Sequence, residues 1–399
     1  MKFSIRLFLG LASLSIAAGM AHAQAGPADE NASQNPGPSP VAFVYATRPT
    51  HLDGFAAAAN GKLTPVPGSP FSTPQFFHLS VNKKFLFGFT GTEIYSYSIA
   101  ADGALHQVAV TNALQIADPC TDGYELYPTS IDASGSTLYV PVAVCPADDK
   151  FVQALEAFKI ESNGELQYLG ASPPTEFQGP VTILGNDKFA YMANCQPINA
   201  SADWYPWTAT YTRESDGFLS PNHDSFPMPP KYYPSPDWVC PEGLAADPTN
   251  HIALAEDAFS PKTHAGYTPL FLASYTADSH GNLTTTNTTE NMAQAQTGFN
   301  LLSISPTGKL LAIGGGDFGS GFQVFHFNGA DPITNFTEPI ETNNPFYFSE
   351  FGWDKSDHLY AVAYGTGLYV YTVTPTSINP APGSPYSIPE TSSLIVVVK

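Results

Sequence analysis

Basic residues are scarce in this chain. It contains 15 Lys and Arg residues against 35 Asp and Glu residues, which gives a formal net charge of −20 at pH 7. Beyond the first 23 residues only two arginines remain, Arg48 and Arg213. Nucleic acids and anionic membranes are bound largely through Lys and Arg, so the charge argues against both as partners. It also argues against a phosphorylated substrate, because Arg is the usual bidentate partner of phosphate.

Long apolar runs are absent after the first residues. Lys2 and Arg6 precede an apolar stretch from Leu7 to Ala18, and the small-residue site 21–23 follows, so residues 1–23 are predicted to be a signal peptide. No later run approaches the roughly 20 apolar residues of a membrane-spanning helix. We therefore expect an exported protein, periplasmic or extracellular, that does not insert into a membrane. Residues 24–40 are predicted to be a disordered lead-in and residues 41–399 one domain.

Cysteine is also rare, and an exported protein is expected to pair the cysteines it has. Four cysteines allow three connectivities. The strand arrangement proposed below favours two of these pairs, Cys120–Cys145 and Cys195–Cys240.

Helical periodicity is nearly absent, and short apolar runs alternate with turns throughout. One turn pattern recurs, in which Asn, Asp or His precedes Gly, and Leu follows two residues later. The glycine supplies a positive φ, and the leucine begins the next strand. The pattern occurs at residues 60–63, 102–105, 163–166, 216–219 and 280–283. It predicts an all-β fold built from hairpins.

A second family of turns precedes each of these, so the chain divides into units of four strands and roughly 50 residues, typical of propeller blades. The strands are labelled A, the innermost, to D. Blade 2 illustrates the unit, with strands at Phe76–Val81, Phe85–Phe89, Glu93–Ile99 and Leu105–Val110. Blades 3 to 7 are predicted to begin at Thr129, Val181, Gly243, Leu301 and Phe346.

Blade 1 lacks an inner strand in the sequence order. Its strands Val41–Ala46, Phe55–Ala59 and Leu63–Val66 correspond to B, C and D. The β-branched run Leu394–Val398 follows the last D strand, where a further A strand would begin. We therefore predict a seven-bladed β-propeller with four antiparallel strands per blade, closed by Leu394–Val398 joining blade 1. Closure removes two exposed sheet edges. An open sandwich or two smaller barrels would not explain the matching turns.

Three motifs carry a family resemblance. They are the phrase Pro-Gly-Ser-Pro followed by an aromatic residue at 67–71 and 382–386, the Asn/Asp-Gly-x-Leu turn, and the strand start Gly308–Ala312. With them, residues 41–399 resemble the lactonase-type seven-bladed propellers, which include propeller 6-phosphogluconolactonases and muconate-lactonizing-like proteins with WD40- or YVTN-like repeats. The His-rich inner strand and the Pro-Asp-x-Gly ending expected of the enzymes are not found, so no catalytic residue is carried over.

The period of two along the inner strands predicts which side chains face the axis. It places His78 and Glu350 there, on blades 2 and 7, and it places Arg48 in the B–C loop of blade 1 between them. A base, an acid and an oxyanion partner are what lactone hydrolysis needs. The alternative is that His78 and Glu350 are hydrogen-bonded linings of a water-filled channel.

Long loops rich in aromatic residues are predicted in blades 3 to 5. Their candidate ligand-binding residues are Trp204, Trp207, Lys231, Tyr232 and Trp238. Aromatic side chains on such loops bind sugar faces or peptides, or they pack on one another. The four aspartates Asp118, Asp122, Asp148 and Asp149 are either cation ligands or solvated loop residues. No recognisable metal or cofactor motif occurs, so none is expected.

The leading hypothesis is a monomeric, non-catalytic propeller that binds a small molecule, a glycan or an envelope protein through its loops. The alternative is a hydrolase of a small lactone, acting in the central channel. The sequence leaves open whether the protein is an enzyme.

Overall fold

The short apolar runs form strands β1 to β30, and none of the described segments is helical. The computed structural model describes residues 39–116, 127–144, 152–175, 179–197, 204–225, 238–259, 270–288, 290–296, 299–315, 321–341, 348–363, 365–388 and 395–398. All but the first of these residues belong to one compact unit, 40–399. No helix in these segments has the length and apolar character needed to cross a bilayer.

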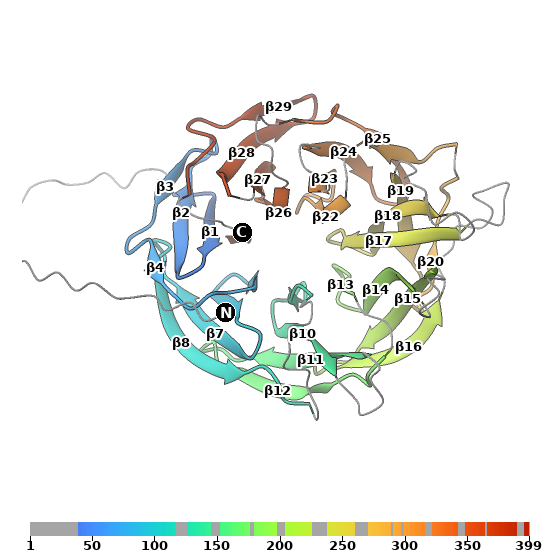
Figure 1. Ribbon diagram of the computed structural model, residues 1–399, viewed down its shortest axis with the longest axis horizontal. Helices are drawn as coiled ribbons and strands as arrows, with labels where there is room; N and C mark the ends of the chain where they lie inside the picture. The colour runs from blue at the N-terminus through green and yellow to red at the C-terminus, as the bar shows by residue number, and fades with distance from the viewer. Residues whose placement is uncertain are drawn as a thin grey trace, which may run out of the picture. The chain divides into compact units, whose positions relative to one another are not determined.

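Seven antiparallel sheets stand in a ring around a central axis (Figure 1), which confirms the predicted seven-bladed propeller. In each sheet the strands follow one another from the axis outward. The inner A strands of blades 1 to 7 are β30 (Ile395–Val398), β5 (His78–Val81), β9 (Ser130–Ile131), β13 (Val181–Ile183), β17 (Trp238–Ala246), β22 (Phe299–Ile304) and β26 (Phe348–Trp353). The B strands are β1 (Ala42–Arg48), β6 (Phe85–Phe89), β10 (Thr137–Val144), β14 (Phe189–Pro197), β18 (His251–Phe259), β23 (Leu310–Gly315) and β27 (His358–Ala363).

The outer half of each blade repeats the same order. The C strands are β2 (His51–Ala57), β7 (Glu93–Ile99), β11 (Val152–Ile160), β15 (Trp204–Arg213), β19 (Leu270–Ala277), β24 (Phe322–Asn328) and β28 (Gly367–Thr374). The D strands are β3 (Leu63–Pro65), β8 (Leu105–Asn112), β12 (Leu166–Ala171), β16 (Leu219–Ser225), β20 (Leu283–Thr284), β25 (Asp331–Asn335) and β29 (Ser377–Pro380). Two short strands, β4 (Phe71–Ser72) and β21 (Ala293–Ala295), pair with the C strands of blades 1 and 5.

The ring closes as predicted, with strands from both ends of the chain in blade 1. β30 pairs antiparallel with β1, from Phe43 opposite Val398 to Ala46 opposite Ile395. In Figure 1 the blue strands of blade 1 therefore stand beside the red strands of blade 7. β30 also contacts β5 and β26, the inner strands on either side. Ile395 and Val397 belong to a buried cluster that joins blades 1 and 7.

Two predicted strand boundaries are wrong. The inner strand of blade 5 begins at Trp238 rather than at Gly243. The C strand of blade 1 begins at His51 rather than Phe55, because a turn of only two residues, Pro49 and Thr50, follows β1. Arg48 pairs with His51 across this hairpin. It is therefore the last residue of β1 and does not lie in a longer B–C loop.

The antiparallel order gives the ring two distinct faces. We call the end with the A–B and C–D connections the turn face, and the end with the B–C and D–A connections the loop face. On the turn face, the recurring glycines adopt positive φ, for example 85° at Gly103 and 100° at Gly217. A buried tyrosine of the preceding blade donates a hydrogen bond to each of three such glycine carbonyls: Tyr45 to Gly103, Tyr139 to Gly217 and Tyr191 to Gly281. The repeated turn thus links neighbouring blades.

The repeated Pro-Gly-Ser-Pro phrase has one role in both copies. Its serine hydroxyl accepts a hydrogen bond from a C-strand backbone N–H, Gly54 to Ser69 in blade 1 and Val370 to Ser384 in blade 7, each at 2.9 Å. Both Ser-Pro bonds are cis. The aromatic residue that ends the second copy, Tyr386, accepts a 2.8 Å hydrogen bond from the Leu63 backbone N–H of blade 1. The second copy therefore crosses the seam where the ring closes.

Candidate functional site

The three candidate catalytic residues come to the same face of the ring, on adjacent blades. Arg48 ends β1 of blade 1, and His78 begins β5 of blade 2. Glu350 is near the start of β26 in blade 7. All three lie at loop-face ends of strands, and β30 lies between β5 and β26.

Arg48 is already paired within its own hairpin. Its Nη2 donates a 3.0 Å hydrogen bond to Oδ1 of Asp53, and its Nε lies 2.7 Å from Oδ2. The side chains are only 13% and 12% exposed. Among the described residues, Arg48 is the one basic residue on the loop face. Its charge is therefore neutralised by a neighbour that water screens only in part.

Glu350 lines a central pocket of about 270 Å³. The pocket walls are inner-strand residues of blades 1, 2, 3, 6 and 7, among them Ser80, Ser303 and Val396. The Glu350 residue is half-buried, and inner strands of five blades surround the pocket that it lines. Burial raises the pKa of Glu350 to about 8, and a hydrogen bond from the Ile395 backbone N–H opposes that rise. At neutral pH the group is mostly protonated, so it suits a proton or hydrogen-bond donor better than a base.

His78 lies at the edge of this arrangement. Its ring stacks on Phe89 of the adjacent strand, with centroids 6.5 Å apart and planes 14° apart. The residues of β5 that line the central pocket are Leu79, Ser80 and Val81. Phe77, which precedes His78, is 46% exposed. Of the three candidates, Glu350 is thus the one that lines the central pocket.

The period of two predicts that alternate side chains of each inner strand face the axis. The structure differs from this prediction. The consecutive residues Ser80 and Val81 both line the central pocket, and so does Ile131 of blade 3. The hydroxyl of Ser80 bonds to Thr129, and that of Ser130 donates to the Val181 carbonyl at 2.7 Å. These hydroxyls join neighbouring inner strands, which explains why small polar residues recur there.

The candidate ligand-binding aromatics lie where blades 4 and 5 extend toward the loop face. β14 pairs with the inner strand as far as Met192 and then continues with β15 alone to the Pro197–Trp204 pair. In blade 5, β17 begins at Trp238, opposite Phe259. Trp207 lies on β15, opposite Asn194 of β14. The side chains of the three tryptophans, and all of Lys231 and Tyr232, lie outside the described part of the structure.

The predicted disulfides are untested for the same reason. Cys120 and Cys145 fall outside the described residues. Cys195 lies on β14 and Cys240 on β17, two strands that contact each other, but their side chains are not described. The aspartates 118, 122, 148 and 149 also fall outside. Within the described segments, no group of three or more His, Cys, Asp and Glu side chains could hold a metal ion.

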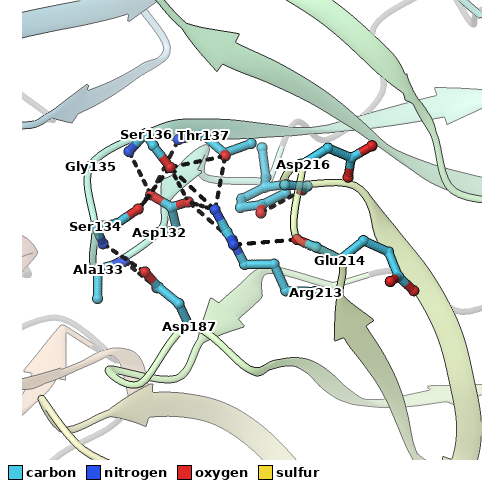
Figure 2. Close-up of polar contacts among 12 residues, drawn as sticks. Asp132, Ala133, Ser134, Gly135, Ser136, Thr137, Asp187, Arg213, Glu214 and Asp216 are labelled. Atoms are coloured by element: carbon cyan, nitrogen blue, oxygen red, sulfur yellow. Dashed lines mark hydrogen bonds and ion pairs between the residues drawn. The ribbon is translucent and has the colours of Figure 1, made fainter.

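A polar cluster on the turn face joins blades 3 and 4 (Figure 2). Asp132 is buried and accepts hydrogen bonds from the backbone N–H groups of Ser136 and Thr137 and from the guanidinium of Arg213. Burial opposes ionisation of Asp132, but these donors lower its pKa. Asp187 of blade 4 accepts from two backbone N–H groups of the same turn. Every carboxylate oxygen has a protein partner, so the cluster holds blades together.

Two buried glutamates were missed in the sequence. Burial raises the pKa of Glu156 to about 7 and that of Glu256 to about 8. Oε1 of Glu156 accepts hydrogen bonds from the backbone N–H groups of Gln115 and Ile116, which lie in the connection from blade 2 to blade 3. Oε1 of Glu256 accepts from the hydroxyl of Tyr275 at 2.5 Å. Glu156 is the one carboxylate of its largely apolar strand, a pattern visible in the sequence, whereas Glu256 is followed by Asp257.

Comparison with known proteins finds structural likeness without sequence matches. No protein-family model and no curated protein sequence matches the chain. The periplasmic gluconolactonase of Pseudomonas aeruginosa has 13% identity and a TM-score of 0.51, over 74% of this chain and 80% of that one. A functionally unknown protein from Desulfotomaculum acetoxidans has 11% identity and a TM-score of 0.54, over 89% and 98%.

A puromycin hydrolase has 12% identity and a TM-score of 0.50, over 87% of this chain but 52% of its own. At such identities the likeness shows the fold alone. That fold is the one expected from the resemblance to lactonase-type seven-bladed propellers. This chain and the gluconolactonase share it.

Proposed function

We propose that this protein is an exported, non-catalytic binding propeller that engages a glycan through the loop-face ends of blades 4 and 5. The observation that carries the proposal is the extension of the β14–β15 and β17–β18 pairs beyond the regular blade, with Trp204, Trp207 and Trp238 on them. Tryptophan offers a broad apolar face and one polar N–H, which suits stacking against a sugar ring. Export rests on the N-terminal signal pattern.

The arrangement of Arg48, His78 and Glu350 supports binding rather than hydrolysis. An oxyanion needs an unpaired donor or cation placed to meet it. Arg48 is held by Asp53 instead. His78 stacks on Phe89 and lies outside the set of residues that line the central pocket.

The alternative function is hydrolysis of a small lactone in the central pocket. Glu350 favours it, because a protonated carboxyl group in an enclosed pocket could donate a proton to a leaving oxygen. The gluconolactonase with the same fold is a further reason to test it. His78 would serve as the base, and Arg48 would have to leave Asp53 to meet the oxyanion.

A glycan array probed with the chain from residue 24 onward tests the first proposal. We expect binding to a restricted set of glycans, and loss of that binding in the double variant Trp204→Ala/Trp207→Ala. Tyr168→Ala is the matched control, since Tyr168 is an exposed aromatic on the outer strand β12 of blade 3. A folded protein that binds no glycan, or a double variant that binds as well as the parent, contradicts the proposal. A peptide array run in parallel identifies a peptide partner instead.

A panel of small lactones tests the alternative. Turnover by the parent that is lost in Glu350→Gln would support hydrolysis and overturn the non-catalytic assignment. Glu350→Gln keeps the size and the hydrogen-bonding capacity of the side chain, so its loss of activity would report on proton transfer. Absence of turnover across the panel by folded protein rejects the alternative.

A further inference from the structure

A second pocket opens on the turn face, away from the site proposed above. It encloses about 590 Å³ and is lined by the A–B turns of blades 2, 3 and 7, by the C–D turn of blade 3, and by Val397 of β30. That volume lies within the range of small-molecule sites, about 300–1,000 Å³. We call it the turn-face pocket.

Three lysines line the turn-face pocket. Lys83 and Lys84 come from blade 2, and Lys355 comes from blade 7 on the other side of β30. All three are exposed, and no carboxylate among the described residues lies within ion-pair distance of them. Unpaired lysines gathered at one pocket are unexpected in a chain with 35 acidic residues.

The acidic residues of the same pocket are already neutralised. Asp132 pairs with Arg213, and Glu161 pairs with Lys159 at 2.7 Å. The three ammonium groups are therefore not balanced from within the lining. An anion that enters the pocket would meet a positive potential.

The floor of the pocket is apolar. Val81, Ile131 and Val397 form part of it and also line the central pocket, so the two spaces adjoin. Phe85 and Ile160 add further apolar surface. A simple inorganic ion would leave this surface in contact with water, whereas an apolar group would cover it.

We propose that the turn-face pocket binds a small organic anion, one with a carboxylate, sulfonate or phosphate group on an apolar body. The charged group contacts Lys83, Lys84 and Lys355, and the apolar body lies on Val81, Ile131 and Val397. This site is on the face opposite the aromatic loops, so it stands or falls independently of the glycan proposal.

Fluorescence titration with 8-anilinonaphthalene-1-sulfonate tests the site, because this probe joins an aromatic body to one anionic group. Its uncharged relative N-phenyl-1-naphthylamine serves as the neutral probe. The test variant is Lys83→Gln/Lys84→Gln/Lys355→Gln. The matched control is Lys62→Gln/Lys188→Gln/Lys309→Gln, which removes the same charge from exposed turn-face lysines outside the pocket.

We expect the test variant to lose about tenfold or more in affinity for the sulfonate, equivalent to about 1.4 kcal/mol. The control should stay within about twofold, and the neutral probe should bind both alike. Benzoate should displace the sulfonate more strongly than inorganic phosphate does. Equal losses in both variants would show general surface charge, and an unaffected test variant would place the probe elsewhere. Either of these results overturns the proposal. So does the absence of any sulfonate binding, or a stronger displacement of the sulfonate by phosphate than by benzoate. Thermal unfolding confirms that each variant is folded; if the triple variant is not, Lys355→Gln is titrated instead, with Lys309→Gln as its control.

Discussion

The two faces of this propeller are built differently. On the turn face the connections are short, and several bond to the next blade: Asn82 donates to the Gly135 carbonyl, and the Asn186 backbone N–H donates to the Thr249 carbonyl. On the loop face the connections differ in length, from the two-residue turn after β1 to residues 226–237 between β16 and β17. The turn face thus repeats one structural device, whereas the loop face differs from blade to blade.

Charge follows the same division. Among the described Lys and Arg residues, only Arg48 lies on the loop face, and Asp53 neutralises its charge. The other described basic residues lie on the turn face: Lys62, Lys83, Lys84, Lys159, Lys188, Arg213, Lys309 and Lys355. The comparison teaches that ring stability and glycan binding are separable. Changes to buried turn-face groups should destabilise the fold, and changes to the loop face should affect glycan binding.

The largest effect is expected from removing the closing strand. Deleting residues 394–399 removes the inner strand of blade 1 and exposes the edge of β1 with which that strand pairs. Ile395, Val396 and Val397 are buried, and each such side chain contributes about 1.5–3 kcal/mol. We expect insoluble or protease-sensitive protein, measured by soluble yield and limited proteolysis. A deletion variant that remains soluble and unfolds cooperatively would show that the ring does not depend on β30.

The next largest loss of stability is expected at the polar cluster that joins blades 3 and 4. Asp132→Ala leaves Arg213, only 12% exposed, without its carboxylate, and should lower the free energy of unfolding by about 3 kcal/mol. Glu214→Gln is the control, because Glu214 is an exposed carboxylate next to the same arginine. Urea unfolding measures both. Equal changes in the two variants would refute the structural role of Asp132.

The buried glutamates predict a pH dependence. The folded pKa of Glu256 is about 8, against about 4.3 in an unfolded chain. Between these values the folded protein retains a proton that the unfolded chain releases, so the free energy of unfolding falls as pH rises from about 5 to 8. Glu256→Gln stays neutral and still accepts from Tyr275. It should be more stable than the parent by roughly 4 kcal/mol at pH 8 and by only about 1 kcal/mol at pH 5. Urea unfolding at pH 5 and pH 8 measures this. An equal difference in stability between variant and parent at both pH values would contradict the prediction.

The smallest effect is expected from one inter-blade hydrogen bond. Tyr139→Phe removes the 2.7 Å bond to the Gly217 carbonyl and should cost about 1 kcal/mol. Tyr95→Phe removes a bond between exposed groups, Tyr95 and Glu93, and should be nearly neutral. Thermal unfolding of the pair measures the difference. A neutral Tyr139→Phe would mean that these tyrosines do not link the blades measurably.

The sequence predicts the ring well because its signals are local. A Gly turn followed by Leu identifies the C–D hairpins of blades 1 to 5 within four residues. The run Leu394–Val398 has one place to pair once the blades are numbered. Pairing of side chains across a hairpin depends on its register. The Arg48–Asp53 ion pair was missed because the turn after Arg48 is shorter than predicted.

Convergence of distant residues was also beyond the sequence. Lys83 and Lys355 are far apart in the chain and share a pocket only after β30 closes the ring. In contrast, Glu156 could have been identified, because a lone carboxylate within a largely apolar strand is a signal of burial.

The separation of stability from glycan binding is tested most directly by measuring both quantities on two variants. Thermal unfolding and glycan-array binding are recorded for Asp132→Ala and for Trp204→Ala/Trp207→Ala. We predict that Asp132→Ala melts several degrees lower and keeps the glycan profile of the parent below its melting temperature. The double tryptophan variant should keep the melting temperature and lose the profile. The account is contradicted if the tryptophan variant is as destabilised as Asp132→Ala, or if it is stable and its glycan profile is unchanged.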